Sequence, residues 1–292
     1  MRLGAITAIG VAVGLFLSRP QPLEQNIIPT HVADLENGKR MFDAGGCLSC
    51  HKPAKGGDGR LPSGGSPLKT PVGTFYPPNI TPDKLTGIGN WSDLDFVNAM
   101  QRGISPDGQH YFPAFPYTSY VRMKMTDILD LKAYLASFEG VDASANKSTN
   151  IFASPVLRRG MGIWKLLNLD PVPVTVEVAQ SASWNRGAYL VNGPGHCAEC
   201  HTPRNITMGL DLSRHLAGGP HPEGKGKVPS LRGLMVRKRF SDVDDLNTAL
   251  RFGEIMGYED MSSGGMGQVQ SNMAKLPEAD TRAIAEYLLS LN

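Results

Sequence analysis

The chain has 292 residues, enough for two domains that each bury a core of their own. Its charge is nearly balanced, with 29 Lys and Arg against 27 Asp and Glu, which excludes the basic surface of a nucleic-acid-binding protein and an acidic solvating tail. The 33 glycines and 22 prolines, with only 19% charged residues, indicate much irregular chain wrapped around a large buried group.

The first element in chain order is an apolar run at the N-terminus. Residues 3–17 are uncharged and mostly apolar, and they lie between Arg2 and Arg19. We expect residues 1–22 to form an uncleaved membrane anchor helix, at the short end of the length that spans a bilayer. A cleaved export signal is the alternative, although the sequence after the run is a poor cleavage site. With Arg2 on the inner side, both interpretations place the rest of the chain outside the cytoplasm.

All four cysteines fall in one repeated pattern, at residues 47–51 and at residues 197–201. In this C-x-x-C-H pattern the two thiols add across the vinyl groups of one porphyrin, and the adjacent histidine binds the iron. The sequence therefore predicts two covalently bound haem c groups. The residues expected to hold them are Cys47, Cys50 and His51 in the first motif and Cys197, Cys200 and His201 in the second. A zinc site is the alternative for paired cysteines, but the pairs stand 150 positions apart (197 minus 47) and each has its own histidine.

The two halves of the chain align as an internal repeat around these motifs. The matching segments are 38–42 with 187–191, 92–95 with 241–244, 99–103 with 249–253, and 127–135 with 280–288. Each half therefore predicts a helix, the haem motif, a long loop, a capped helix that ends at glycine, a ligand loop and a closing helix.

This order of elements predicts an all-α fold with two tandem haem domains at residues 31–140 and 183–292, behind the N-terminal anchor helix. Residues 141–182 are the predicted linker, because they begin with small and polar residues and end in a proline-rich stretch. The middle of the linker, residues 158–169, has the pattern of a short amphipathic helix. Such a helix either packs between the domains or serves as a docking surface for a partner or for lipid headgroups.

The second axial ligand of each iron decides between electron transfer and chemistry on a bound small molecule. We expect it in the loop before each closing helix, where a methionine thioether would raise the reduction potential and so suit an electron carrier. In the second domain we predict Met266, because the glycines around it let the chain approach the porphyrin closely. Met261 and Met273 are its neighbours, and core packing is the alternative role for any single methionine.

The first domain offers two candidates, Met123 and Met125. Thr126 can cap the following helix, which would hold Met125 against the helix start and leave Met123 with more freedom to reach the iron. Two methionines so close in sequence can also exchange as ligands. Steric freedom therefore favours Met123.

Several runs of residues carry a family resemblance. They are Ala44-Gly45-Gly46-Cys47, Pro78-Asn79-Ile80-Thr81-Pro82-Asp83, residues 86–92, residues 111–120, Asn185-Arg186-Gly187-Ala188-Tyr189-Leu190, and residues 200–205. With these runs the chain resembles, over nearly its whole length, the membrane-anchored dihaem cytochromes c that are electron-transfer subunits of periplasmic dehydrogenases. The resemblance implies two tandem cytochrome c domains on the periplasmic side of the inner membrane.

The resemblance also implies the partners and one ligand. The electron donor would be a quinoprotein, flavoprotein or molybdenum-containing dehydrogenase that carries out the catalysis, and the acceptor would be a terminal oxidase, a quinone or a soluble cytochrome c. In this family the ligand methionine stands nine positions before the lysine of the Lys-Ala-Tyr-Leu segment, here Lys132, which gives Met123. Met125 is a departure from the family pattern.

Two other functions remain as alternatives at this point. A dihaem oxidoreductase, such as a peroxidase, would act at one five-coordinate iron and would bind carbon monoxide there when reduced. A haem-based sensor would carry signalling elements, which this sequence lacks.

Overall fold

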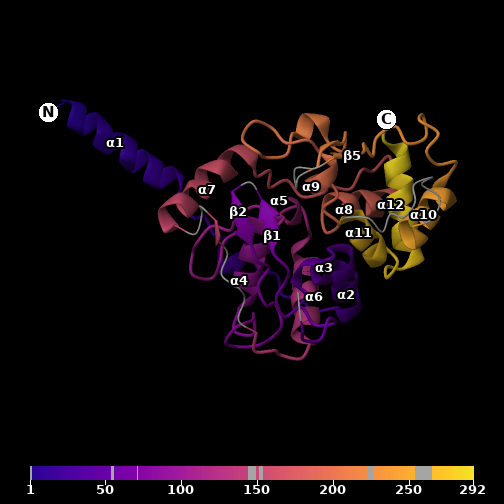
Figure 1. The fold of residues 1–292 in the computed structure, drawn as a ribbon, viewed down its shortest axis with the longest axis horizontal. Helices are drawn as coiled ribbons and strands as arrows, with labels where there is room; N and C mark the ends of the chain where they lie inside the picture. Colours follow the sequence, from indigo (N-terminus) through magenta and orange to yellow (C-terminus); the bar gives the residue numbers. More distant parts are fainter. Residues whose placement is uncertain are drawn as a thin grey trace.

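The computed structural model describes residues 2–53, 56–70, 72–143, 149–150, 154–221, 226–253 and 265–292. Its longer helices are α1 (Arg2–Leu17), α2 (Leu35–Ala44), α6 (Met125–Ala136), α7 (Pro155–Asn168), α8 (Ala182–Asn192), α10 (Val243–Phe252), α11 (Gly265–Met273) and α12 (Glu278–Ser290). The short ones are η1 (Gln25–Ile27), α3 (Cys47–His51), α4 (Asp93–Val97), η2 (Asn98–Arg102), α5 (Tyr117–Tyr120), α9 (Ala198–His201) and η4 (Leu212–Arg214). Figure 1 shows α2 to α6 in one lobe, α8 to α12 in a second lobe, and α1 projecting from the body.

Short strands accompany the helices. They are β1 (Leu68–Thr70), β2 (Gly73–Phe75), β3 (Thr149–Asn150), β4 (Gly219–Pro220) and β5 (Lys227–Val228). β1, β2 and β3 form one antiparallel sheet in that order, and β4 pairs with β5. The prediction of an all-α fold is therefore correct in that helices predominate, and wrong in that it left out these strands. The unpredicted β1–β2 and β4–β5 pairs lie in the long loops after the haem motifs, where they provide partners for backbone groups that no helix satisfies.

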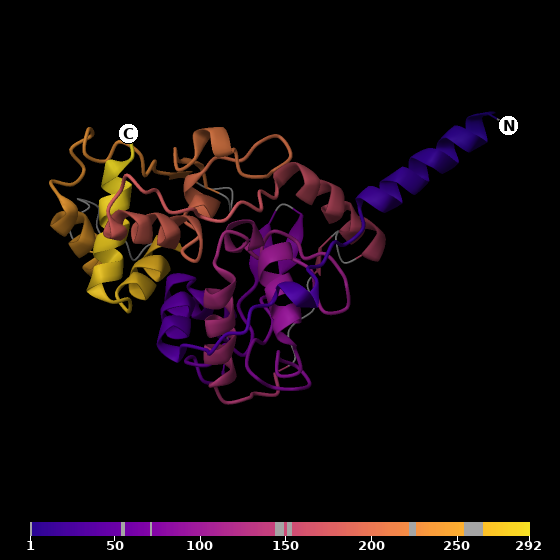
Figure 2. The same cartoon turned by 180° about the vertical axis from the view of Figure 1, so that it is seen from behind.

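In both lobes the core is built on a crossing of two helices at a glycine. α2 crosses α6 so closely that a Cβ atom at Gly38 would lie 2.2 Å from the carbonyl oxygen of Asp130. α8 crosses α12 in the same way, since a Cβ atom at Gly187 would lie 1.9 Å from the carbonyl oxygen of Ala283. The view from behind shows α2 beside α6 in one lobe and α8 beside α12 in the other (Figure 2). Gly38 and Gly187 occupy matching positions of the internal repeat, so both halves use the same device to bring their first and last helices together.

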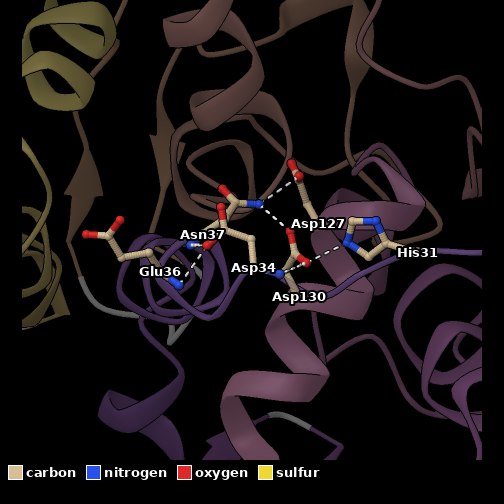
Figure 3. Close-up of polar contacts among 6 residues, drawn as sticks. All are labelled: His31, Asp34, Glu36, Asn37, Asp127 and Asp130. Atoms are coloured by element: carbon tan, nitrogen blue, oxygen red, sulfur yellow. Dashed lines mark hydrogen bonds and ion pairs between the residues drawn. The ribbon is translucent and has the colours of Figure 1, made fainter.

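A buried carboxylate network fixes α6 against the segment that leads into α2 (Figure 3). The Asp130 carboxylate accepts hydrogen bonds from His31 Nε2 at 2.6 Å, the Asp34 amide at 2.8 Å and Asn37 Nδ2 at 2.8 Å. Asn37 Nδ2 also donates to Asp127 at 3.0 Å. Burial favours the neutral form of Asp130, but these donors hold its pKa below its ordinary value. The network therefore stabilises the helix that directly follows Met123.

Helix α7, within the predicted linker, contacts both lobes. Lys165 donates hydrogen bonds to the carbonyl oxygens of Arg102 at 2.6 Å and Gly103 at 2.7 Å in the first lobe. Trp164 Nε1 donates to the carbonyl oxygen of Thr207 in the second lobe at 2.8 Å. These contacts are those of a helix packed between the domains, which is one of the two interpretations of the amphipathic pattern.

Helix α1 is apolar, and its C-terminal end is fixed to the body of the protein. The side chains of its last two turns are largely exposed, for example Leu15 at 53% and Phe16 at 58%. The Ser18 carbonyl accepts a hydrogen bond from His110 Nε2 at 3.0 Å, and the Ser18 hydroxyl accepts one from Arg159 Nε at 3.2 Å. Within the described residues, no helix combines the length and the hydropathy that crossing a membrane requires. The structure thus does not show the membrane-spanning anchor that the sequence predicted.

Candidate haem sites

The first haem motif forms a helical turn that orients His51. α3 spans the motif from Cys47 to His51, and this spacing places both cysteines and the histidine on neighbouring turns of one short helix. His51 Nδ1 donates a hydrogen bond to the carbonyl oxygen of Pro78 at 2.7 Å. Burial lowers the pKa of His51, so the ring is neutral, and the proton held on Nδ1 leaves the Nε2 lone pair for a metal.

The second motif repeats this geometry. Cys197 precedes α9, which runs from Ala198 to His201. His201 Nδ1 donates to the carbonyl oxygen of Pro229 at 2.8 Å, and burial again lowers the pKa of the imidazole. Both histidines therefore present Nε2 as a ligand atom, held in orientation by a backbone carbonyl 27 residues later in the first half and 28 residues later in the second.

The cysteines fit thioether attachment. None of the four is in a disulfide bond. Burial raises the pKa of the Cys47 thiol to about 12, and it raises that of Cys197 to about 12 as well. Each of these two thiols is thus neutral at physiological pH and packs against the hydrophobic core. The donor set in each half, two thiols and one neutral imidazole on a short helix, fits one covalently bound haem c.

Met123 lies in the hydrophobic core between α5 and α6. Its side chain is 2% exposed, and its carbonyl oxygen accepts a hydrogen bond from Gln101 Nε2 at 3.0 Å. Met125 is partly buried and is the first residue of α6. The predicted cap at Thr126 is wrong, because the N-cap position is Lys124 and Thr126 lies inside the helix. Met125 is nevertheless held at the start of α6 as its first residue, and Met123 remains the predicted ligand.

Met266 lies in the first turn of α11, a helix that was not predicted. The repeat predicts a ligand loop there, and the glycines on both sides of Met266 disfavour a helix, yet packing of the helix carries its end, Met273, into the core at 5% exposure. Met261 lies outside the described residues. Met266 remains the predicted ligand of the second iron, and Met273 has the burial of a core residue.

Sequence reasoning missed two kinds of contact around the haem motifs. The first is the pair of proline carbonyls that orient the histidines, for which the matching distance from each histidine to a proline was the available signal. The second is the set of contacts that the haem motifs make across the domain interface. Asn272 donates to the Ser49 hydroxyl at 2.8 Å, and Glu199 accepts from Ser119 at 3.0 Å and from Thr118. Ser49 and Glu199 are variable positions of the C-x-x-C-H pattern, so nothing in the pattern marks them.

The two matching sites, each with a histidine oriented for iron and two cysteines for attachment, define a c-type cytochrome with two haems. Comparison with known proteins agrees. The cytochrome c family model matches residues 35–139 and 185–292. The chain therefore belongs to the cytochrome c family and carries two covalently bound haem c groups, which excludes the zinc alternative.

Similar proteins narrow the group within the family. The chain is 42% identical to a protein of Cereibacter sphaeroides named diheme cytochrome c-type, over 97% of this chain and 95% of that protein. It is 40% identical to a nicotinate dehydrogenase subunit of Pseudomonas putida, over 97% of this chain and 24% of the relative. It is 34% identical to the cytochrome subunit of a Gluconobacter japonicus fructose dehydrogenase, over 94% of this chain and 56% of the relative. The chain thus spans nearly all of the first relative and only part of the other two. The resemblance to dihaem cytochromes and dehydrogenase cytochrome subunits is confirmed.

Proposed function

We propose that this chain is the electron-transfer subunit of a periplasmic dehydrogenase, and that it passes electrons from that partner to an acceptor of the respiratory chain without oxidising a substrate itself. The observation that carries the proposal is the pair of equivalent histidine sites in one chain, whose motifs are connected by a hydrogen bond between the residues just before them. The names of several relatives, which are cytochrome subunits of fructose, gluconate and alcohol dehydrogenases, support a dehydrogenase as the donor.

The residues of this chain prepare each site for electron transfer. When bound, each haem supplies exchange of one electron between ferrous and ferric iron. Pro78 and Pro229 hold the proton of each histidine on Nδ1, so the ring stays in one orientation. Met123 lies in the hydrophobic core, so as the second ligand it would give the first iron an apolar surrounding, and a dry site limits the solvent reorganisation that accompanies a change of charge.

We further propose that α1 holds the protein at the periplasmic face of the inner membrane. The exposed apolar side chains of α1 and the flanking Arg19 support contact with the apolar region and headgroups of a bilayer. The attachment of Ser18 to Arg159 and His110 would keep the body of the protein close to that surface. If the chain lacking residues 1–17 stays with the membranes when they are floated on a density gradient, α1 is not the attachment.

The electron-transfer proposal is tested with purified haem-loaded protein and the membrane fraction of a source strain that lacks it. Fructose, gluconate, ethanol and nicotinate are added in turn, and the haem absorption is followed. We expect one substrate to reduce both haems, and neither reduced haem to bind carbon monoxide because both irons are six-coordinate. Carbon monoxide binding at one haem, together with consumption of peroxide and no reduction by any substrate, would instead support the oxidoreductase alternative.

A further inference from the structure

His196 adopts a backbone conformation that side chains seldom take. Its φ angle is +40°, in the left-handed region that is unfavourable for residues with a Cβ atom. His196 directly precedes Cys197, and the residue directly before Cys47 in the first half is Gly46, with φ of +57°. The first motif thus has a glycine where this turn needs one, whereas the second has a histidine in the same strained position. Such strain persists where the surrounding structure makes use of the side chain.

The His196 side chain reaches the other domain. Its Nε2 atom donates a hydrogen bond to the carbonyl oxygen of Gly45 at 3.1 Å. Its ring also packs edge-on against Tyr120, with centroids 5.8 Å apart and an interplanar angle of 80°. Tyr120 belongs to the first domain and is 6% exposed, so the contact is part of the packed interface.

These contacts join the two segments that carry the haem-binding cysteines. A Cβ atom at Gly45 would lie 3.5 Å from Cys47 Sγ and 3.5 Å from the carbonyl oxygen of Pro194. On the other side, a Cβ atom at Gly195 would lie 3.7 Å from Cys197 Sγ. The segments just before both attachment cysteines therefore lie close together, and one hydrogen bond, from His196 to Gly45, connects them.

Other contacts across the interface hold the motifs in place without joining these segments. The Ser49 hydroxyl accepts from Asn272 Nδ2, which lies on α11 and not beside Cys197. Glu199 accepts from Thr118 and Ser119 of α5. Of these contacts among the described residues, the hydrogen bond from His196 to Gly45 is the one that connects the segment before Cys47 to the segment before Cys197. Asn272 provides a matched control for any effect of the interface in general.

We propose that His196 is the bridging residue between the two haem sites and that it sets the rate at which they exchange an electron. In the exchange, the ferrous iron of one haem is oxidised and the ferric iron of the other is reduced. One electron moves, no bond forms or breaks, and no proton is transferred. His196 acts as a positioning residue, because it binds neither iron and fixes the distance and contact between the two attachment segments. The inference rests on the proposed electron-transfer function.

The test compares His196→Gly with wild type and with Asn272→Ala, all with both haems attached. Glycine is the residue that the first motif uses at this position, so it removes the side chain without adding strain. Pulse radiolysis delivers less than one electron per protein, and redistribution between the haems is followed by absorption at several protein concentrations. The rate that does not depend on concentration is the exchange within one molecule.

We expect His196→Gly to slow this exchange by about tenfold, equivalent to ~1.4 kcal/mol in activation free energy, with both midpoint potentials unchanged. Asn272→Ala should stay close to wild type. An unchanged rate in His196→Gly would overturn the proposal, and so would equal slowing in Asn272→Ala, because the effect would then belong to domain association. If His196→Gly loses its second haem, His196→Asn replaces it, since asparagine tolerates the left-handed conformation and is too short to reach Gly45. The assay uses no dehydrogenase, so failure to accept electrons from one remains a separate result.

Discussion

Replacing Gly187 by alanine is expected to damage the second domain, although alanine is the better helix former. A Cβ atom at this position would lie 1.9 Å from the carbonyl oxygen of Ala283 and 2.9 Å from Tyr287 Cβ. Ordinary van der Waals contact begins at 3.4 Å, so α8 and α12 would have to move apart by about 1.5 Å (3.4 minus 1.9). The atoms nearest to the added Cβ belong to the backbone of Ala283, so they cannot turn away as the end of a flexible side chain could.

The expected loss of stability follows from two opposing effects. Alanine gains about 1 kcal/mol over glycine in the interior of a helix. Against this, a gap of 0.5 to 1 Å already forfeits roughly a quarter to a half of each dispersion contact, and overpacked cores lose about 1–3 kcal/mol or more. The contacts at risk are those of Leu190, Val191, Ala285 and Leu288, all at most 3% exposed. Because the required displacement exceeds that gap, we expect a loss at the upper end of this range, about 3 kcal/mol, and after the gain from helix propensity a net loss of about 2 kcal/mol in the unfolding free energy of this domain.

Urea unfolding of the haem-loaded protein, followed by circular dichroism and by haem absorption, measures this change. Gly160→Ala is the matched control, because Gly160 lies within α7 and a Cβ atom there meets nothing within 4 Å. The control should raise the unfolding free energy by up to about 1 kcal/mol. If Gly187→Ala is as stable as Gly160→Ala, the close crossing does not limit the residue at this position, and the reasoning from the Cβ contacts is refuted.

Three further predictions concern the first site, the carboxylate network and the interface. Met123→Ala should abolish the weak sulfur-to-iron absorption band of one haem and lower its potential, while Met125→Ala should do neither; the opposite pattern in spectra and redox titration would make Met125 the ligand. The folded-state pKa of Asp130 is lowered, so its carboxylate stabilises the fold above its unfolded pKa of about 3.9 and this contribution is lost as the pH falls through the lower folded value. Urea midpoints between pH 2 and 6 should therefore depend less on pH in Asp130→Asn, and an unchanged dependence would exclude this role. Glu199→Ala should cost about 1.5–3 kcal/mol in thermal or urea unfolding, because it removes a buried charged acceptor and leaves Arg204 without its ion pair; stability equal to wild type would contradict this.

Features set by neighbouring residues could be predicted from the sequence. The capped helices illustrate this, since Ser92 and Asp95 form a capping box at the start of α4. In the second half, Asp242 caps α10, which ends at Gly253 with φ of +72°. The haem motifs are equally local, because attachment and iron binding depend on five consecutive residues. Cap and motif signals of this kind need no knowledge of the rest of the chain, and the capped helices at α4 and α10 are confirmed, whereas the cap predicted at Thr126 is not.

Features that depend on distant residues could not be predicted in this way. Helix α6 begins two positions earlier than a cap at Thr126 predicts, because the carboxylate network around Asp130, built with residues nearly one hundred positions earlier, stabilises the first turn without a side-chain cap. Helix α11 forms despite its glycines, and its Asn272 contacts the haem motif of the other domain. The sequence contains no local signal for either contact, since each needs the relative position of separate elements.

The internal repeat separates residues that serve the fold from residues that serve the relation between the sites. Gly38 and Gly187 are the same residue because both halves need the same close helix crossing. Gly46 and His196 differ although their backbones adopt the same left-handed turn, and the difference places an imidazole against Gly45 of the other half. A duplicated domain alone would favour glycine at both turns, since glycine carries no steric cost there. The repeat therefore differs between the halves at the place where the two sites meet. There the hydrogen bond from His196 to Gly45 connects the two haem domains, as electron exchange between them requires under the proposal.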